Sequence, residues 1–219
     1  MSNFPQIKYR YWPAVGRGVG IRVLLEGAGV PYERQNHDGQ MPDPALFAVP
    51  AVCIGGEWIS QTSNIMESLG AAFNMGVPEN ASARARMTSL TCYDLQCEVF
   101  SHVTGNSARS WAACKGFLEG RAFKYLDVIE KQFRLFPGFL FNGDAETYPD
   151  YTFVGAYMAV SLWMGEKGAN YMKEYMQVSC PNLTAVLNKI MEKPKVKAFE
   201  AEHAGEALGP ENAGKAWNE

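Results

Sequence analysis

This sequence of 219 residues lacks several features that define other classes of protein. It contains no run of about 18 apolar residues, so we expect neither a membrane-spanning helix nor a membrane partner. Its first residues lack the basic and apolar stretches of a secretory signal, and its net charge of −3 offers no basic stripe for nucleic acid. These absences predict a globular, cytoplasmic protein that does not bind nucleic acid.

Metal-binding and disulfide signals are missing as well. The three histidines (His37, His102 and His203) have no metal-ligand spacing, and the five cysteines contain no C-x-x-C pair. An odd number of cysteines without paired spacing indicates reduced thiols in a reducing compartment. We therefore expect no metal ion and no dithiol redox motif.

Two kinds of hydrophobic pattern divide the chain near residue 77. In residues 1–76, short aromatic and apolar runs predict strands at 6–12, 32–36, 51–54 and 57–59. Apolar residues three and four positions apart predict two helices in the same region, at 16–29 and 62–74. This order predicts a small mixed sheet covered by helices, an α/β domain.

The pattern is mainly helical in residues 80–219. Helices are predicted at 81–105, 108–135, 152–164, 168–178 and 181–192. A loop is predicted at 136–150, Pro194 should end the last helix, and a polar, glycine-rich tail should begin near residue 203. The second domain is therefore expected to be all-α.

Three motifs then resemble the cytosolic glutathione transferase superfamily. Residues 11–22, Tyr-Trp-Pro-Ala-Val-Gly-Arg-Gly-Val-Gly-Ile-Arg, are similar to the first strand and helix of its tyrosine-type classes (sigma, pi, mu and alpha). Residues 47–52 resemble its Val-Pro before a hairpin, and residues 61–65 resemble its Gln-Ser-x-x-Ile. The resemblance runs from Ile7 to about Glu202. It implies a thioredoxin-like domain followed by a helical domain, in a detoxification enzyme that conjugates glutathione to small hydrophobic electrophiles.

The resemblance implies that Tyr11 is the catalytic residue. The reaction needs a thiolate, and a free thiol with a pKa of about 8.5 is mostly protonated at neutral pH. A phenol that donates a hydrogen bond to the sulfur favours the thiolate and lowers the thiol pKa. Tyr9 points to the same face of the strand and is the main alternative.

The same resemblance implies where glutathione binds. Val49, before a cis Pro50, would pair through its backbone with the cysteinyl part. The helix that begins near Gln61 would bind the γ-glutamyl carboxylate, with Thr62 as both N-cap and ligand. Arg17 could reach the same end of glutathione.

Asp94 lies on a helical face with apolar neighbours (Met87, Leu90 and Cys97). The family resemblance implies that it crosses the interface of a homodimer to bind the amino group of glutathione. An internal salt bridge is the alternative, because a carboxylate among apolar residues is normally paired.

The electrophile should bind between the two domains. The candidates for its pocket are Trp12, Phe100, Val103, Thr104 and Trp111. Packing within the core is the alternative role for each aromatic side chain among them.

The chain departs from the family pattern in two places. It lacks the Trp and Lys that many classes use for the glycine carboxylate of glutathione, so His37, Gln40 or no residue takes that role. The family's Ser/Thr-x-x-Asp at the start of a later helix is aligned here with residues 152–155, where Gly155 replaces the aspartate. We expect this replacement to weaken that helix.

Two other functions remain compatible with these residues. A glutathione-dependent isomerase of the prostaglandin D synthase type would keep the same binding site. A lens crystallin or another non-catalytic binding relative would keep the fold and lose access to the site. The retained Tyr11, Val49-Pro50 and Gln61-Thr62 favour an enzyme.

Overall fold

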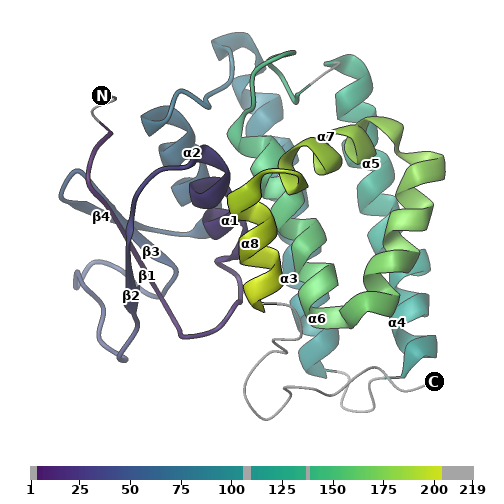
Figure 1. Cartoon of the computed structure of the whole chain (residues 1–219), viewed down its shortest axis with the longest axis horizontal. Helices are drawn as coiled ribbons and strands as arrows, with labels where there is room; N and C mark the ends of the chain where they lie inside the picture. Colours follow the sequence, from purple (N-terminus) through teal and green to yellow (C-terminus); the bar gives the residue numbers. More distant parts are fainter. Residues whose placement is uncertain (1–3, 106–109, 137–138, 204–219) are drawn as a thin grey trace.

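The computed structural model describes residues 4–105, 110–136 and 139–203. It confirms the predicted fold class, with a small mixed sheet followed by a largely helical domain (Figure 1). The sheet has four strands, β1 (Ile7–Tyr11), β2 (Glu33–Asn36), β3 (Ala51–Ile54) and β4 (Glu57–Ser60).

The strand order is β2-β1-β3-β4. β1 pairs with β2 in parallel, whereas β1–β3 and β3–β4 are antiparallel. Ile7, Tyr9 and Tyr11 alternate with less buried residues along β1, so one face of this strand lies in the core. Two helices accompany the sheet, α1 (Val19–Ala28) and α2 (Thr62–Ala72).

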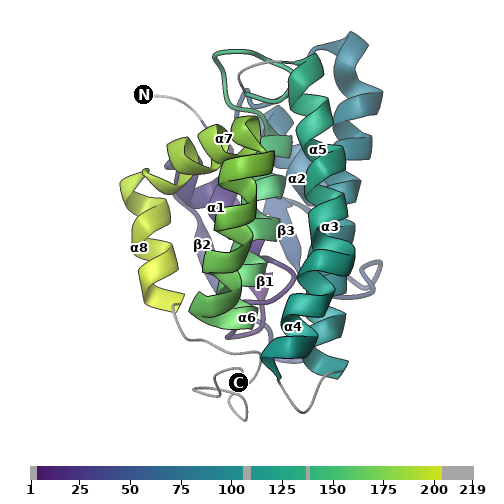
Figure 2. The same ribbon diagram turned by 90° about the vertical axis from the view of Figure 1, so that its right-hand side faces the viewer.

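The helical domain is built around two long helices, α3 (Ser82–Gly105) and α6 (Tyr148–Ser179), which pack on each other. The predicted helix over 108–135 is instead three pieces: α4 (Trp111–Phe117), a turn of π-helix (Leu118–Ala122) and α5 (Phe123–Leu135). Figure 2 shows α3, α4 and α5 on one side of α6 and the last helices, α7 (Pro181–Met191) and α8 (Pro194–His203), on the other.

The predicted break between helices at 152–164 and 168–178 is present inside α6, where Gly165 has a non-helical backbone at φ 73°. The helix predicted at 181–192 ends at Met191, before Pro194. A further helix, α8, was not predicted, and it begins at Pro194 because the fixed φ of proline suits the first helical position. The predicted tail from residue 204 onward, including Trp217, lies outside the described residues.

At the start of α6, the prediction that the cap aspartate is replaced by Gly155 was wrong. A complete capping box is present five residues earlier than predicted, formed by Thr147 and Asp150. The Asp150 carboxylate accepts hydrogen bonds from the backbone N–H of Thr147 at 2.7 Å and of Leu140 at 2.8 Å. Burial raises the pKa of Asp150 to about 7, while these donors act in the opposite direction. The cap therefore begins the helix at residue 148, and Thr152 lies inside it.

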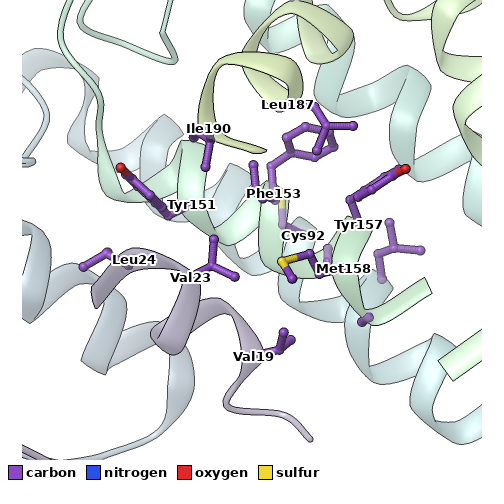
Figure 3. Close-up of a cluster of buried hydrophobic side chains, with 14 of the residues drawn as sticks. Val19, Val23, Leu24, Cys92, Tyr151, Phe153, Tyr157, Met158, Leu187 and Ile190 are labelled. Carbon is purple, nitrogen blue, oxygen red and sulfur yellow. The ribbon is translucent and has the colours of Figure 1, made fainter. Parts of the chain in front are cut away.

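Gly155 has a packing role. A Cβ atom at this position would lie 2.4 Å from Cα of Gly20, so only a glycine lets the backbones of α1 and α6 touch. Around this contact, side chains of α1, α6 and α7 point toward one another (Figure 3). One hydrophobic core therefore extends from the sheet through α1 into the helical domain.

Among the described residues, no helix combines the length and apolar character that crossing a bilayer requires.

Candidate functional site

Tyr11 is the last residue of β1, and its phenol is buried against the segment that leads into α1. A Cβ atom on Gly16 would lie 2.3 Å from the Tyr11 hydroxyl oxygen, so the glycine makes room for the phenol. Burial raises the pKa of Tyr11. The backbone amides of Arg17 and Gly18 and the positive charge of the Arg17 side chain lower it. The phenol oxygen therefore faces N–H groups that stabilise negative charge.

Tyr9 has different surroundings. Its hydroxyl points at Gly18, where a Cβ atom would lie 2.1 Å from the oxygen. The adjoining cavity, which Phe199 of α8 also lines, has a volume of only about 10 Å³, room for little more than one water molecule. Burial raises the pKa of Tyr9. With no room for a substrate beside its oxygen, Tyr9 is the weaker candidate for catalysis.

The start of α2 is an uncapped helix terminus. Gln61, not Thr62, occupies the N-cap position and makes no side-chain cap hydrogen bond, which corrects the predicted cap. The reason is the backbone of Gln61, whose φ of 69° already places Thr62 in the first helical turn. For a residue other than glycine, such a conformation costs about 1–3 kcal/mol and is often associated with function.

The hydroxyl of Thr62 is buried and makes no hydrogen bond of ordinary geometry with a described residue. It lies beside the phenol of Tyr93, on α3, and favours the charged form of that phenol. A buried hydroxyl and the free N–H groups of a helix terminus together fit a carboxylate ligand.

The Val49–Pro50 peptide bond is cis. Within the described residues, neither the N–H nor the C=O of Val49 forms a backbone hydrogen bond, although β3 begins only two residues later. Both groups can therefore pair with an extended ligand placed along this segment.

One face of α3 contacts the Arg17 segment. Gln96 donates a hydrogen bond from Nε2 to the carbonyl oxygen of Arg17 at 3.2 Å, and the Arg17 guanidinium lies 5.5 Å from the centre of the Phe100 ring. Arg17 also acts electrostatically on Tyr93 and Cys97. Arg17 is exposed and forms no salt bridge within the described residues, so its charge is available to an anionic ligand.

Tyr93, Gln96 and Cys97 were not among the predicted site residues. Burial raises the pKa of both the Tyr93 phenol and the Cys97 thiol, and each group is a neighbour of the other. A sequence signal existed, because residues 93, 96, 97 and 100 are spaced as one helical face. That spacing shows a shared face but not which segment the face contacts.

Asp94 is exposed on the adjoining face of α3, where Met87 and Leu90 are also exposed. It forms no salt bridge within the described part of the chain, so the alternative of an internal ion pair has no support there. The role of Asp94 as a ligand for the amino group of glutathione across a homodimer interface therefore remains a prediction.

The five residues predicted to bind the electrophile have separate surroundings. The exposed Trp12 ring packs edge-on against His37 with 4.4 Å between centroids, and Phe100 packs against Trp163 at 5.5 Å. Trp111 packs instead against Tyr171 at 5.7 Å. Val103 is buried, and the side chain of Thr104 lies outside the described residues. Trp12 follows Tyr11 directly in the chain, and Phe100 borders the Arg17 segment.

The two alternatives for the glycine carboxylate lie near the end of β1. The backbone N–H of His37 donates to the carbonyl oxygen of Tyr11 at 2.7 Å. Gln40 is exposed, and its carbonyl oxygen accepts a hydrogen bond from Arg10 at 3.0 Å. Across the described ranges, no group of three or more His, Cys, Asp and Glu residues is arranged to hold a metal ion.

The family model described as "Glutathione S-transferase, C-terminal domain" matches residues 93–203, half of the chain. The chain belongs to the glutathione S-transferase family. The match covers the part of α3 that carries Tyr93, Asp94 and Gln96, as well as the helices that follow it.

Solved structures of glutathione S-transferases from two nematodes have the same fold. The enzyme from Ascaris lumbricoides gives a TM-score of 0.65 at 19% identity and covers 91% of this chain and 98% of its own. The protein from Caenorhabditis elegans gives a TM-score of 0.62 at 19% identity and covers the same shares of the two chains. No curated protein matches this sequence.

Proposed function

We propose that this protein is a glutathione transferase that conjugates the thiolate of glutathione to hydrophobic electrophiles. The observation that carries the proposal is the arrangement around Tyr11. Its phenol lies against Gly16 and near Arg17, and Tyr93 links this region to the buried hydroxyl of Thr62 at the start of α2.

Each part of glutathione has a chemically matched group in this proposal. The γ-glutamyl carboxylate binds the N–H groups at the start of α2, the Thr62 hydroxyl and the charge of Arg17. The cysteinyl backbone pairs with the N–H and C=O of Val49. This arrangement directs the thiol toward Tyr11.

Tyr11 acts by hydrogen bonding in this mechanism. Its O–H donates to the sulfur, which favours the thiolate and lowers the thiol pKa. The thiol proton leaves to solvent, and the thiolate then forms a bond to the electrophilic carbon as the leaving group departs. Trp12 and Phe100 offer apolar surface beside this position.

Residues 1–76 form the glutathione-binding domain in this proposal, and residues 80–219 shape the second substrate's site. We also propose a homodimer, because large apolar side chains are exposed at Phe47 (92%), Met87 (47%) and Leu90 (42%). Free cysteines at all five positions are consistent with a reducing compartment such as the cytoplasm.

A set of three assays tests the proposal. Wild-type protein is assayed with glutathione against an aryl halide, an organic hydroperoxide and a prostaglandin endoperoxide. Turnover of the aryl halide supports conjugation, and turnover of the endoperoxide alone supports the isomerase. Glutathione binding by calorimetry without any turnover indicates a non-catalytic relative, and absence of binding contradicts the proposal.

A further inference from the structure

The segment between β1 and α1 carries the peptide groups that surround the Tyr11 phenol. Gly16 lies directly against the hydroxyl oxygen, and the amides of Arg17 and Gly18 act on the same oxygen. Any change in the orientation of these peptides alters the electrostatic environment of Tyr11. The groups that fix their orientation therefore affect the phenol without touching it.

Two side chains of the helical domain hold this segment by its carbonyl groups. Gln96 of α3 donates from Nε2 to the carbonyl oxygen of Arg17 at 3.2 Å. Trp163 of α6 donates from Nε1 to the carbonyl oxygen of Val15, also at 3.2 Å. Both donors are almost completely buried, so their positions are fixed by packing in the helical domain.

Peptide geometry transmits the effect of Gln96 to Tyr11. In a trans peptide, the C=O of one residue and the N–H of the next point in opposite directions within one plane. The carbonyl oxygen of Arg17 is directed toward Gln96, so the N–H of Gly18 is directed away from α3. That N–H belongs to one of the two amides that act on the Tyr11 oxygen.

We propose that Gln96 is a positioning residue for Tyr11, whose amide holds the Arg17–Gly18 peptide with its N–H directed toward the phenol oxygen. In this way a side chain of the helical domain sets the acidity of a phenol in the amino-terminal domain. The effect of Gln96 on catalysis rests on the proposed function. Its effect on the Tyr11 phenol does not.

The test uses Gln96→Met, which keeps the length of the side chain and removes its N–H donors. The matched control is Ser89→Ala, a buried polar residue of the same helix that contacts Thr152, away from the Arg17 segment. The titratable groups that face Tyr11 are Arg17, Tyr93 of α3 and Tyr9 of β1. Both variants leave all three unchanged.

In Gln96→Met, the apparent pKa of the bound thiol in the pH profile of kcat/KM should rise by about 0.5–1 unit, the equivalent of one lost hydrogen bond. The direction follows because a less stabilised phenol oxygen makes the O–H a weaker donor to the thiolate. S-methylglutathione, which has no ionisable thiol, should bind to the variant as tightly as to wild type. Ser89→Ala should leave the pH profile in place.

An unchanged profile in Gln96→Met, or an equal shift in Ser89→Ala, would overturn the inference. If Gln96→Met does not fold, Gln96→Leu provides a second uncharged variant without a hydrogen-bond donor. If wild-type protein has no turnover at all, the proposed function fails, and the ring carbon resonance of ¹³C-labelled Tyr11 decides the inference instead. That resonance should shift in Gln96→Met and not in Ser89→Ala, and no shift would contradict the positioning role.

Discussion

Two phenols, two residues apart on β1, face different surroundings. The oxygen of Tyr9 adjoins a very small cavity, whereas the oxygen of Tyr11 faces the amides of the Arg17 segment and lies near Tyr93 of α3. Strand alternation places both rings on the same face of the sheet, which is why sequence alone leaves the choice between them open. The distinction arises from the path of the chain after the strand.

Substitution of Tyr11 provides the first test at this scale. Tyr11→Phe should reduce turnover by about 10²-fold, the low end for a positioned proton-handling group, and keep glutathione affinity. The pKa of the bound thiol should rise, because the thiolate loses its hydrogen-bond donor, so the pH–rate profile should move upward. Tyr9→Phe serves as the control. Full turnover in Tyr11→Phe would exclude the assignment.

Thr62 allows binding to be separated from stability. Thr62→Val should weaken glutathione binding by about 1.5–3 kcal/mol, the value of a hydrogen bond to a charged group. The same change should have little effect on the stability of the fold, because the hydroxyl makes no hydrogen bond of ordinary geometry within the described residues and only its contact with Tyr93 is lost. Calorimetric titration and thermal unfolding measure the two effects. The neighbouring Ser63→Ala should alter neither, and equal affinity in Thr62→Val would remove the residue from the site.

The residues of the site differ in how far a sequence reveals them. The sequence motifs name Tyr11, Val49-Pro50 and Gln61-Thr62 because these residues lie next to strand and helix ends with recognisable local signals. Tyr93 and Gln96 lie in the middle of α3, and their importance comes from a segment nearly eighty residues earlier in the chain. Local patterns contain no information about such a long-range contact.

At the scale of elements, α6 illustrates how a correct pattern can be assigned to the wrong position. A Thr followed three residues later by Asp occurs at 147–150, but the loop prediction extended to residue 150 and concealed it. Tyr148 and Pro149 look like loop residues in sequence, yet Pro149 falls in the first turn of the helix, where its missing N–H costs nothing. Gly155 was then mistaken for a lost cap.

The contact between α1 and α6 gives a matched pair of glycine substitutions. Gly155→Ala should lower the free energy of unfolding by about 1–3 kcal/mol, because its Cβ would meet the backbone of Gly20. Gly116→Ala, on the exposed face of α4 with no atom near its Cβ, should raise that energy by about 0.5–1 kcal/mol. Denaturant unfolding measures both. A neutral Gly155→Ala would show that the helices can separate without penalty.

At the scale of the whole molecule, the exposed apolar residues lead to a prediction about assembly. Leu90→Asp combined with Phe47→Ser should convert the proposed dimer to a monomer in light scattering, because both remove apolar area from the interface. Val178→Ser changes a residue of α6 that is about as exposed as Phe47, and it should leave the mass unchanged. A wild-type monomer at micromolar concentration would contradict the premise.

The continuous core has a consequence for how this protein unfolds. Buried side chains from the sheet, α1, α6 and α7 belong to one cluster. Neither the sheet region nor the helical domain can therefore open without exposing apolar surface of the other. The chain should therefore melt in one cooperative transition, with equal calorimetric and van't Hoff enthalpies, despite its two kinds of architecture. Two separate transitions in a calorimetric scan would contradict this. The helical domain thus sets the temperature at which Tyr11 loses its surroundings, and sequence changes far from Tyr11 can adjust the temperature range over which the candidate site stays intact.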